Sequence, residues 1–211
     1  MELKGEFMCQ EVFEIVQNMD LSQVENKMAL QCAPIITGIK VSNLLIVSSK
    51  DEGTVRVILR KTGIIHYRLL RQNNKTTFLL FRIPGLTKHL QDPKVQLVLK
   101  ESGYRDFSLG GILRTFQGRY ETYMNKGEGF PHEIGILLGY PIEDVVGFME
   151  QKGKNFLYSG YWKVYKDVPL KKQIFEQYEN AKETLILLLA SGYEIHSIIQ
   201  FYRDKNLAFS G

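Results

Sequence analysis

Hydrophobic residues recur at helical spacing through most of this chain. Within residues 6–19 they fall on one helix face, at Val12, Ile15, Val16 and Met19. A second helix is expected over residues 23–33. Ser22 and Glu25 fit a capping box at its start, and Pro34 ends it because a proline disfavours helical geometry in the residue before it.

Three segments have the composition of β-strands instead. Residues 43–48, with the sequence NLLIVS, predict a buried strand. Residues 64–70 and 76–81 are rich in β-branched and aromatic residues, and the polar segment between them contains Asn73 and Asn74, which tolerate positive φ. We expect these two segments to form a hairpin at the centre of the sheet.

Most of the remaining chain is predicted to be helical. Residues 51–62 fit a strand or a helix, and the helix is favoured because Val55, Ile58 and Leu59 share one helix face. Prolines and N-cap residues mark the starts of several others. These helices are expected around residues 86–90, from Pro93, from Ser108, from Pro131, from Pro141, from Pro169 and through residues 195–202.

After Gly153 the hydrophobic pattern changes to strict alternation. Phe156, Tyr158, Trp162 and Val164 lie on one side, and Leu157, Tyr161 and Tyr165 on the other. Aromatic residues on both sides predict a strand that is covered on both faces, with Gly160 as a bulge or a point of close approach. We expect this strand to share a sheet with the hairpin. The predicted fold is therefore α+β, with a small, largely antiparallel sheet, about eight helices and a helix-rich C-terminal half.

The chain has 211 residues, 44% of them apolar, which suits one globular domain over residues 1–211. The segment NKGEG at residues 125–129 is the candidate boundary between an α/β lobe, residues 1–125, and a helical lobe with one aromatic strand, residues 130–211. No apolar run approaches the length of a membrane span, and acidic residues interrupt the first apolar stretch. We therefore expect a cytoplasmic protein that is not bound to a membrane.

The net charge of +4 is unevenly distributed. Residues 56–105 contain eleven Lys or Arg and two acids, a net +9, which leaves −5 for the rest of the chain. A basic section can meet an acidic partner or a phosphate-bearing ligand. The alternative, which we favour, is a solvated sheet face, since Arg68, Arg71 and Lys75 follow strand-like spacing.

Residues 130–165 contain most of the candidate chemistry. Flat aromatic surfaces and polar groups alternate there, at His132, Glu133, Tyr140, Tyr161 and Trp162. Cys32 and Lys40 precede the first strand and are candidates to contact the same ligand. We expect a binding or accessory protein for a small planar or anionic ligand, and the alternative is that these rings fill the core.

An enzyme is a second function class. Cys32 is a candidate nucleophile, and His132 with Glu133 a candidate acid and base. A zinc protease motif is excluded because Ile136 stands where the second histidine is needed. The two cysteines of the chain cannot close a structural metal site, so no metal is predicted, and no motif identifies a cofactor. The oligomeric state is left open.

The two helices from Pro131 and Pro141 also fit a DNA-binding helix-turn-helix. The second helix would then have to place Ile142, Glu143 and Asp144 against the DNA. Two carboxylates at that position oppose the phosphate charge that dominates affinity. Nucleic-acid binding is therefore the weakest of the three hypotheses.

Two segments, FPHEIGILLGYPIEDVVGF at residues 130–148 and GYWKVY at residues 160–165, resemble the signature of a bacterial family of unknown function found mainly in anaerobes. The segments CAP at residues 32–34 and GIK at residues 38–40 match it too. The resemblance implies no established activity. The family pattern has a further cysteine shortly before GYWKVY, and this chain has FLY there, so no shared thiol or metal role is implied.

Overall fold

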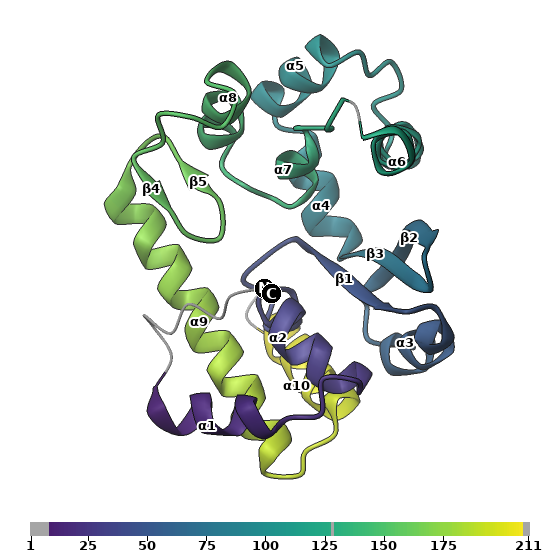
Figure 1. Ribbon diagram of the computed structural model, residues 1–211, viewed down its shortest axis with the longest axis vertical. Helices are drawn as coiled ribbons and strands as arrows, with labels where there is room; N and C mark the ends of the chain where they lie inside the picture. Colours follow the sequence, from purple (N-terminus) through teal and green to yellow (C-terminus); the bar gives the residue numbers. More distant parts are fainter. Residues whose placement is uncertain (1–8, 128, 209–211) are drawn as a thin grey trace.

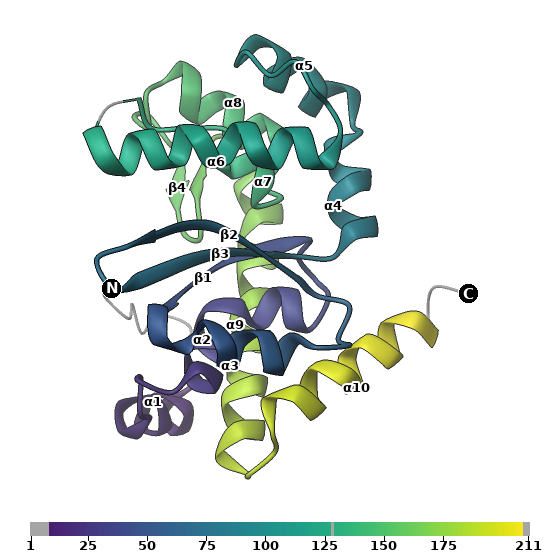
Figure 2. The same cartoon turned by 90° about the vertical axis from the view of Figure 1, so that its right-hand side faces the viewer.

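A small antiparallel sheet lies between two layers of helices in the computed structural model, which describes residues 9–127 and 129–208. Figure 2 shows the sheet edge-on, with α5, α6, α7 and α8 on one side and α1, α2, α3 and α10 on the other. The predicted α+β class and the helix-rich C-terminal half are confirmed. The described residues contain ten α-helices, against about eight expected, and each overlaps a segment that the sequence predicts to be helical.

The sheet contains β1 (Ser42–Ser48), β2 (Ile65–Gln72) and β3 (Lys75–Phe81) in the order β1-β3-β2. The predicted hairpin is β2–β3. Asn73 and Asn74 form its turn with φ of +51° and +56°, the left-handed conformation that two-residue hairpin turns need. Only β3 is central, since β1 pairs along its other edge. Side chains alternate between the two faces of a strand, so neighbouring residues of β3 point to opposite layers of helices.

Each face of β3 belongs to a different hydrophobic core. Phe78 and Leu80 contribute to the core shared with α1 (Gln10–Asn18), α2 (Val24–Ile36), α3 (Glu52–Leu59), α9 (Val168–Ala190) and α10 (Ile195–Ala208). Leu79 and Phe81 contribute to the core shared with α4 (Ile83–Leu90), α5 (Pro93–Glu101), α6 (Leu109–Lys126), α7 (Ile134–Leu137) and α8 (Ile142–Glu150). Burial on both faces explains why this strand is a nearly continuous apolar run.

The longest helix of the described residues, α9, runs from the middle of the molecule to its lower end near α1 and α10 (Figure 1). Its first half carries Phe175 and Tyr178, which pack on Trp162, and its second half carries Leu185 and Ile186, which lie in the core with α2. Asp167 caps its start by accepting a hydrogen bond from Leu170 N at 3.3 Å. None of the helices in the described part of the chain combines the length and the apolar character that a membrane crossing needs.

The aromatic segment differs from the prediction. It is a hairpin of two short strands, β4 (Tyr158–Ser159) and β5 (Lys163–Val164), and it forms a separate two-stranded sheet. The prediction of one strand in the main sheet was therefore wrong. Gly160 lies in the turn, and a Cβ there would clash with the Phe175 ring, so glycine lets the hairpin lie this close to α9.

The second helix also differs from the prediction, because α2 continues through Pro34 to Ile36. Pro34 lies in the last turn, and the buried residues around it pack on the sheet and on α9, which outweighs its unfavourable local geometry. The N-cap residue is Gln23, without a side-chain hydrogen bond, so the capping box at Ser22 is not formed. Residues 51–62 contain α3, as favoured, whereas residues 6–8 of the first helix lie outside the described residues.

A pair of glycine substitutions tests the close contact of the β4–β5 turn with α9. We expect Gly160→Ala to lower the free energy of unfolding by about 1–3 kcal/mol through the clash with Phe175. Gly118→Ala is the control, because Gly118 lies on the exposed face of α6 with open space beside it among the described residues. It should raise stability by about 0.5–1 kcal/mol. Urea unfolding measures both, and an unchanged Gly160 variant would contradict the contact.

Candidate functional site

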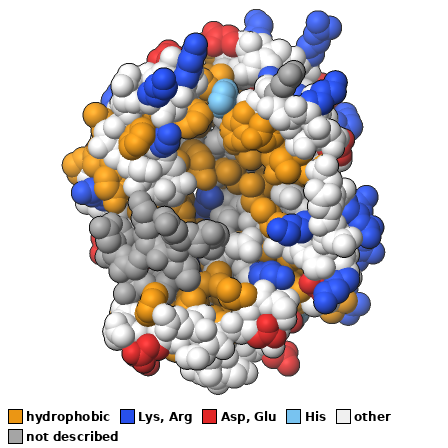
Figure 3. All heavy atoms as spheres, in the orientation of Figure 1, with side chains coloured by type: hydrophobic (Ala, Val, Ile, Leu, Met, Phe, Trp, Pro, Cys, Tyr) orange, Lys and Arg blue, Asp and Glu red, His pale blue; other side chains and the backbone are white. Residues whose placement is uncertain are grey.

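An aromatic cavity lies between α7, α8 and the β4–β5 hairpin, with a volume of about 310 Å³. Figure 3 shows hydrophobic side chains gathered around a hollow on this face of the molecule. Six aromatic or imidazole rings line the cavity, together with the charged residues Asp144 and Lys163. The rings belong to Phe130, His132, Tyr140, Phe148, Tyr161 and Trp162.

The inner wall is a stacked pair of rings. The centroids of Tyr140 and Trp162 are 4.7 Å apart, with 26° between the ring planes. Tyr140 is brought here by the tight turn between α7 and α8. A Cβ at Gly135 would lie 2.9 Å from Val145 Cγ2, so the glycine allows α7 to lie against α8. The turn therefore places one ring of the wall, and the hairpin places the other.

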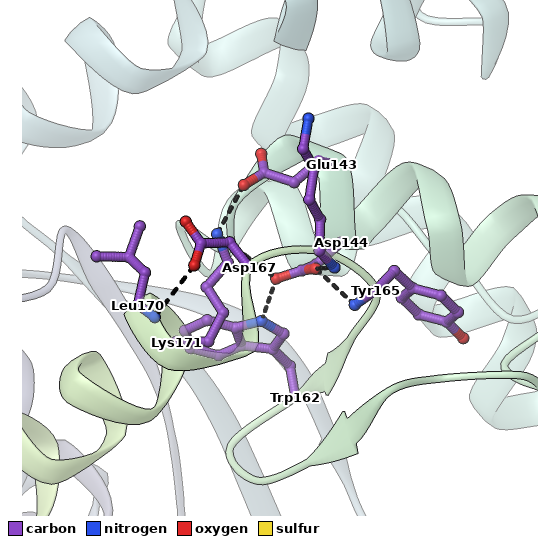
Figure 4. Close-up of polar contacts among 8 residues, drawn as sticks. Glu143, Asp144, Trp162, Tyr165, Asp167, Leu170 and Lys171 are labelled. Carbon is purple, nitrogen blue, oxygen red and sulfur yellow. Dashed lines mark hydrogen bonds and ion pairs between the residues drawn. The ribbon is translucent and has the colours of Figure 1, made fainter.

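Asp144 fixes the position of Trp162. Its carboxylate is 2% exposed and accepts hydrogen bonds from Trp162 Nε1 at 2.8 Å, from Tyr165 N at 2.8 Å and from Lys166 N at 3.2 Å (Figure 4). A buried indole N–H needs an acceptor, and a buried carboxylate needs donors. These bonds join the first turn of α8 to the end of the β4–β5 hairpin.

Lys171 compensates part of the negative charge around Asp144. Its buried ammonium lies 2.6 Å from Glu143 Oε1 and 4.0 Å from Asp144 Oδ2. Burying a single charge is costly, whereas a paired and hydrogen-bonded charge is tolerated. The three side chains come from α8 and α9, so the network connects both helices beneath the cavity.

The outer wall contains His132 and the side chains around it. Its ring centroid lies 5.2 Å from that of Phe130 and 5.3 Å from that of Phe148. Lys163 Nζ donates to Gly153 O at 2.7 Å and lies 5.7 Å from the centroid of the Phe148 ring. This wall is more open than the inner one, since Phe130 is 38% exposed.

Lys40 lies behind Tyr140. Its Nζ atom is 5.1 Å from the centroid of the Tyr140 ring and 5.8 Å from that of Tyr178, and it donates to Asn43 Oδ1 at 3.0 Å. Among the described residues no carboxylate lies within ion-pair distance of it. Burial therefore lowers the pKa of Lys40 to about 8.

Cys32 is fully buried and is not part of the cavity. Its thiol donates to Leu44 O at 3.6 Å. Burial raises the pKa of Cys32 to about 12, despite the opposing influence of the nearby Lys40 charge. The thiolate that a nucleophile requires is thus disfavoured at neutral pH.

Glu133 points away from its neighbour His132. Its buried carboxylate accepts a hydrogen bond from Tyr104 Oη at 3.0 Å and lies 3.1 Å from Arg119 Nε. The structure therefore does not bring His132 and Glu133 together as an acid and base. It places His132, Tyr140, Tyr161 and Trp162 around one cavity, Lys40 behind its wall, and Cys32 and Glu133 elsewhere.

The sequence prediction of the site missed the remaining rings and charges of the cavity, which belong to Phe130, Asp144, Phe148 and Lys163. In the sequence, Asp144 was considered only as a residue at the start of the helix that would face DNA. One signal was present, since the single Trp of the chain predicts that an acceptor must lie nearby if the indole is buried. No rule of spacing identifies which acceptor it is.

The first turn of α8 bears on the DNA-binding hypothesis. Asp144 lies inside the protein against Trp162, and Glu143 is paired with Lys171 of α9. The preceding helix, α7, has only four residues. The first turn of α8 is thus occupied by contacts within the protein. In a DNA-recognition helix, the first turn would instead be exposed and would contact bases.

The chain was compared with protein-family models. Residues 28–199 match the model described as "Protein of unknown function (DUF3793)". No curated protein and no solved structure matches the chain. The expected membership of a family of unknown function is confirmed, and the comparisons add no activity.

Asp144→Asn tests the network under the cavity. The amide has one acceptor oxygen where the carboxylate has two, so at least one of the donors from Trp162, Tyr165 and Lys166 loses its partner. We expect the free energy of unfolding to fall by about 2–4 kcal/mol, with a shift in tryptophan emission. Glu176→Gln, on the exposed side of α9, is the control and should change stability by less than about 0.5 kcal/mol. Equal stability of both variants would contradict the role of Asp144.

Because the pKa of Lys40 is lowered in the folded protein, we expect the stability of the protein to depend on pH. Its pKa is about 8 in the folded protein and 10.5 in the reference state, so between these values the unfolded chain binds more protons. Stability should therefore rise with pH in this window. Relative to Lys40→Met, we expect wild type to gain roughly 1–2 kcal/mol from pH 7 to pH 9.5.

Urea unfolding at several pH values checks this expectation. The range stops at pH 9.5 because buried tyrosines such as Tyr140, whose pKa is raised by burial, reduce stability at higher pH. Lys88→Met, at an exposed lysine of α4, is the control and should leave the pH profile of wild type unchanged. A profile that is the same in the Lys40 and Lys88 variants would contradict the prediction.

Proposed function

This chain belongs to the DUF3793 family, and we propose from its geometry that it is a binding or accessory protein for a small planar ligand held in the aromatic cavity. The observation that carries the proposal is the convergence of six rings, from three separate segments, around one open volume. A ligand site of this kind combines apolar surface with a few fixed polar groups.

The size and shape of the cavity support a planar ligand. Its volume of about 310 Å³ lies at the lower end of the range for small-molecule sites. The two rings of the inner wall, Tyr140 and Trp162, stack on each other at 4.7 Å, a usual distance for aromatic rings, and both line the cavity. A flat ligand can extend the same arrangement.

The alternative is that the rings only fill a core. Rings in a core are covered on all sides, and Trp162, at 8% exposed, is close to that limit. Phe130 and Tyr161 are each 38% exposed although they line the same cavity. A group of apolar rings left open to solvent is typical of a binding site.

The inner wall is held in place before any ligand arrives. Asp144 fixes Trp162, and Tyr161 Oη donates to Glu179 Oε1 at 2.8 Å. Fixed side chains lose little rotamer freedom on binding, which favours affinity. By contrast, His132, Asp144 and Ser159 line the cavity without a hydrogen bond between them among the described contacts, so the geometry favours binding over catalysis.

Binding of N-phenyl-1-naphthylamine, a neutral flat fluorophore, tests the proposal. We expect saturable binding with energy transfer from Trp162, and a three- to tenfold weaker affinity in Phe148→Leu, since about 0.5–1.5 kcal/mol of ring contact is lost. Phe201→Leu is the matched control, because Phe201 is 61% exposed on α10 and does not line the cavity. Fluorescence titration measures all three proteins. Absent binding, or equal loss in both variants, would overturn the proposed function.

A further inference from the structure

We propose that the ligand of the aromatic cavity carries an anionic group, and that Lys163 is the residue that selects it. This inference depends on the proposed function, because it concerns the ligand class of the same cavity. It follows from the charges around the cavity, which are unevenly neutralised.

Lys163 is the lining residue with a positive charge. Its Nζ atom donates to Gly153 O at 2.7 Å and lies 4.8 Å from the centroid of the Phe156 ring. An ammonium has three donors, so two remain for a ligand. Within the described residues no carboxylate pairs with it. Its charge is thus available at the wall of the cavity.

Asp144, the lining residue with a negative charge, is already engaged. Its two oxygens accept three hydrogen bonds, from Trp162, Tyr165 and Lys166, and Lys171 lies 4.0 Å away. A cationic ligand would have to compete with these donors. The carboxylate therefore attracts a cationic ligand much less strongly than its formal charge implies.

Lys40 adds a second positive charge on the far side of the inner wall. It lies 5.1 Å from the centroid of the Tyr140 ring and has no ion-pair partner among the described residues. Together, Lys40, Lys163 and Lys171 against Glu143 and Asp144 leave a net charge of +1 around the cavity. A buried charge acts over a longer distance than an exposed one, since water screens it less.

A structural role for Lys163 is the competing explanation. Its hydrogen bond to Gly153 O holds the end of α8 against β5, and a lysine can be present for that reason alone. The two roles differ in their consequences. If Lys163 only holds the turn, its substitution should change the affinity for every ligand equally. If it selects the ligand, its substitution should weaken the binding of anionic ligands specifically.

Three nearly isosteric probes separate these roles: 2-naphthoate is an anion, 2-naphthamide is neutral and 2-naphthamidine is a cation. We expect wild type to bind the naphthoate about tenfold more tightly than the naphthamide, as a charge-assisted hydrogen bond predicts, and the amidine most weakly. The preference should decrease with added salt. Isothermal titration calorimetry gives the affinities.

Substitution assigns the preference to one residue. Lys163→Gln should reduce naphthoate binding to the level of the naphthamide and leave the naphthamide unchanged. Lys163→Arg keeps the charge and should retain the preference, so it serves if the Gln variant fails to fold. Lys172→Gln is the control, because Lys172 is exposed on α9 over the Tyr158 ring and does not line the cavity.

The outcomes distinguish this inference from the proposed function. Equal affinities for the three probes, tighter binding of the amidine, or an undiminished preference in Lys163→Gln would overturn the inference and leave a planar-ligand site. Binding of N-phenyl-1-naphthylamine without binding of any naphthoate-series probe would also overturn the inference. No binding of any of the four probes to wild type would overturn both.

Discussion

The hydrogen bond from the Trp162 indole to the buried Asp144 carboxylate holds the functional region together. One end belongs to α8, on the far side of the main sheet from α2, and the other to a hairpin that packs on α9. Because the carboxylate also accepts from the backbone at Tyr165 and Lys166, it fixes the chain direction just before α9 begins. The cavity therefore exists as a consequence of how these elements are joined.

Local sequence signals determine many of the elements of the fold, and those elements can be predicted. The β2–β3 turn follows from Asn73 and Asn74, and the predicted helix starts at Pro93 and near Ser108 are those of α5 and α6, which the side chains of Asp92 and Ser108 cap. The exceptions are set by tertiary contacts. Helix α2 passes through Pro34 because its buried face packs on the sheet and α9, which no local rule reveals.

The site is predictable only in part, for the same physical reason. Alternating aromatics identify Tyr161 and Trp162 as special, but alternation cannot distinguish one strand from a tight hairpin that turns at Gly160. The neighbours His132 and Glu133 look like a functional pair in the sequence, yet the turn at the start of α7 sends them to opposite sides. Partners that are distant in the sequence, such as Asp144 and Trp162, have no signature in spacing.

A buried charge network beneath an open aromatic cavity costs folding free energy. Its presence here is explained if a rigid cavity wall is useful. Lys171, Glu143 and Asp144 are held in or near an apolar environment, where hydrophobic replacements of similar volume often give equal or greater stability. Apolar residues in place of Asp144 would, however, leave the buried Trp162 indole N–H without an acceptor. The network keeps the ring stacked on Tyr140, so the proposed ligand would meet a wall whose side chains are already fixed.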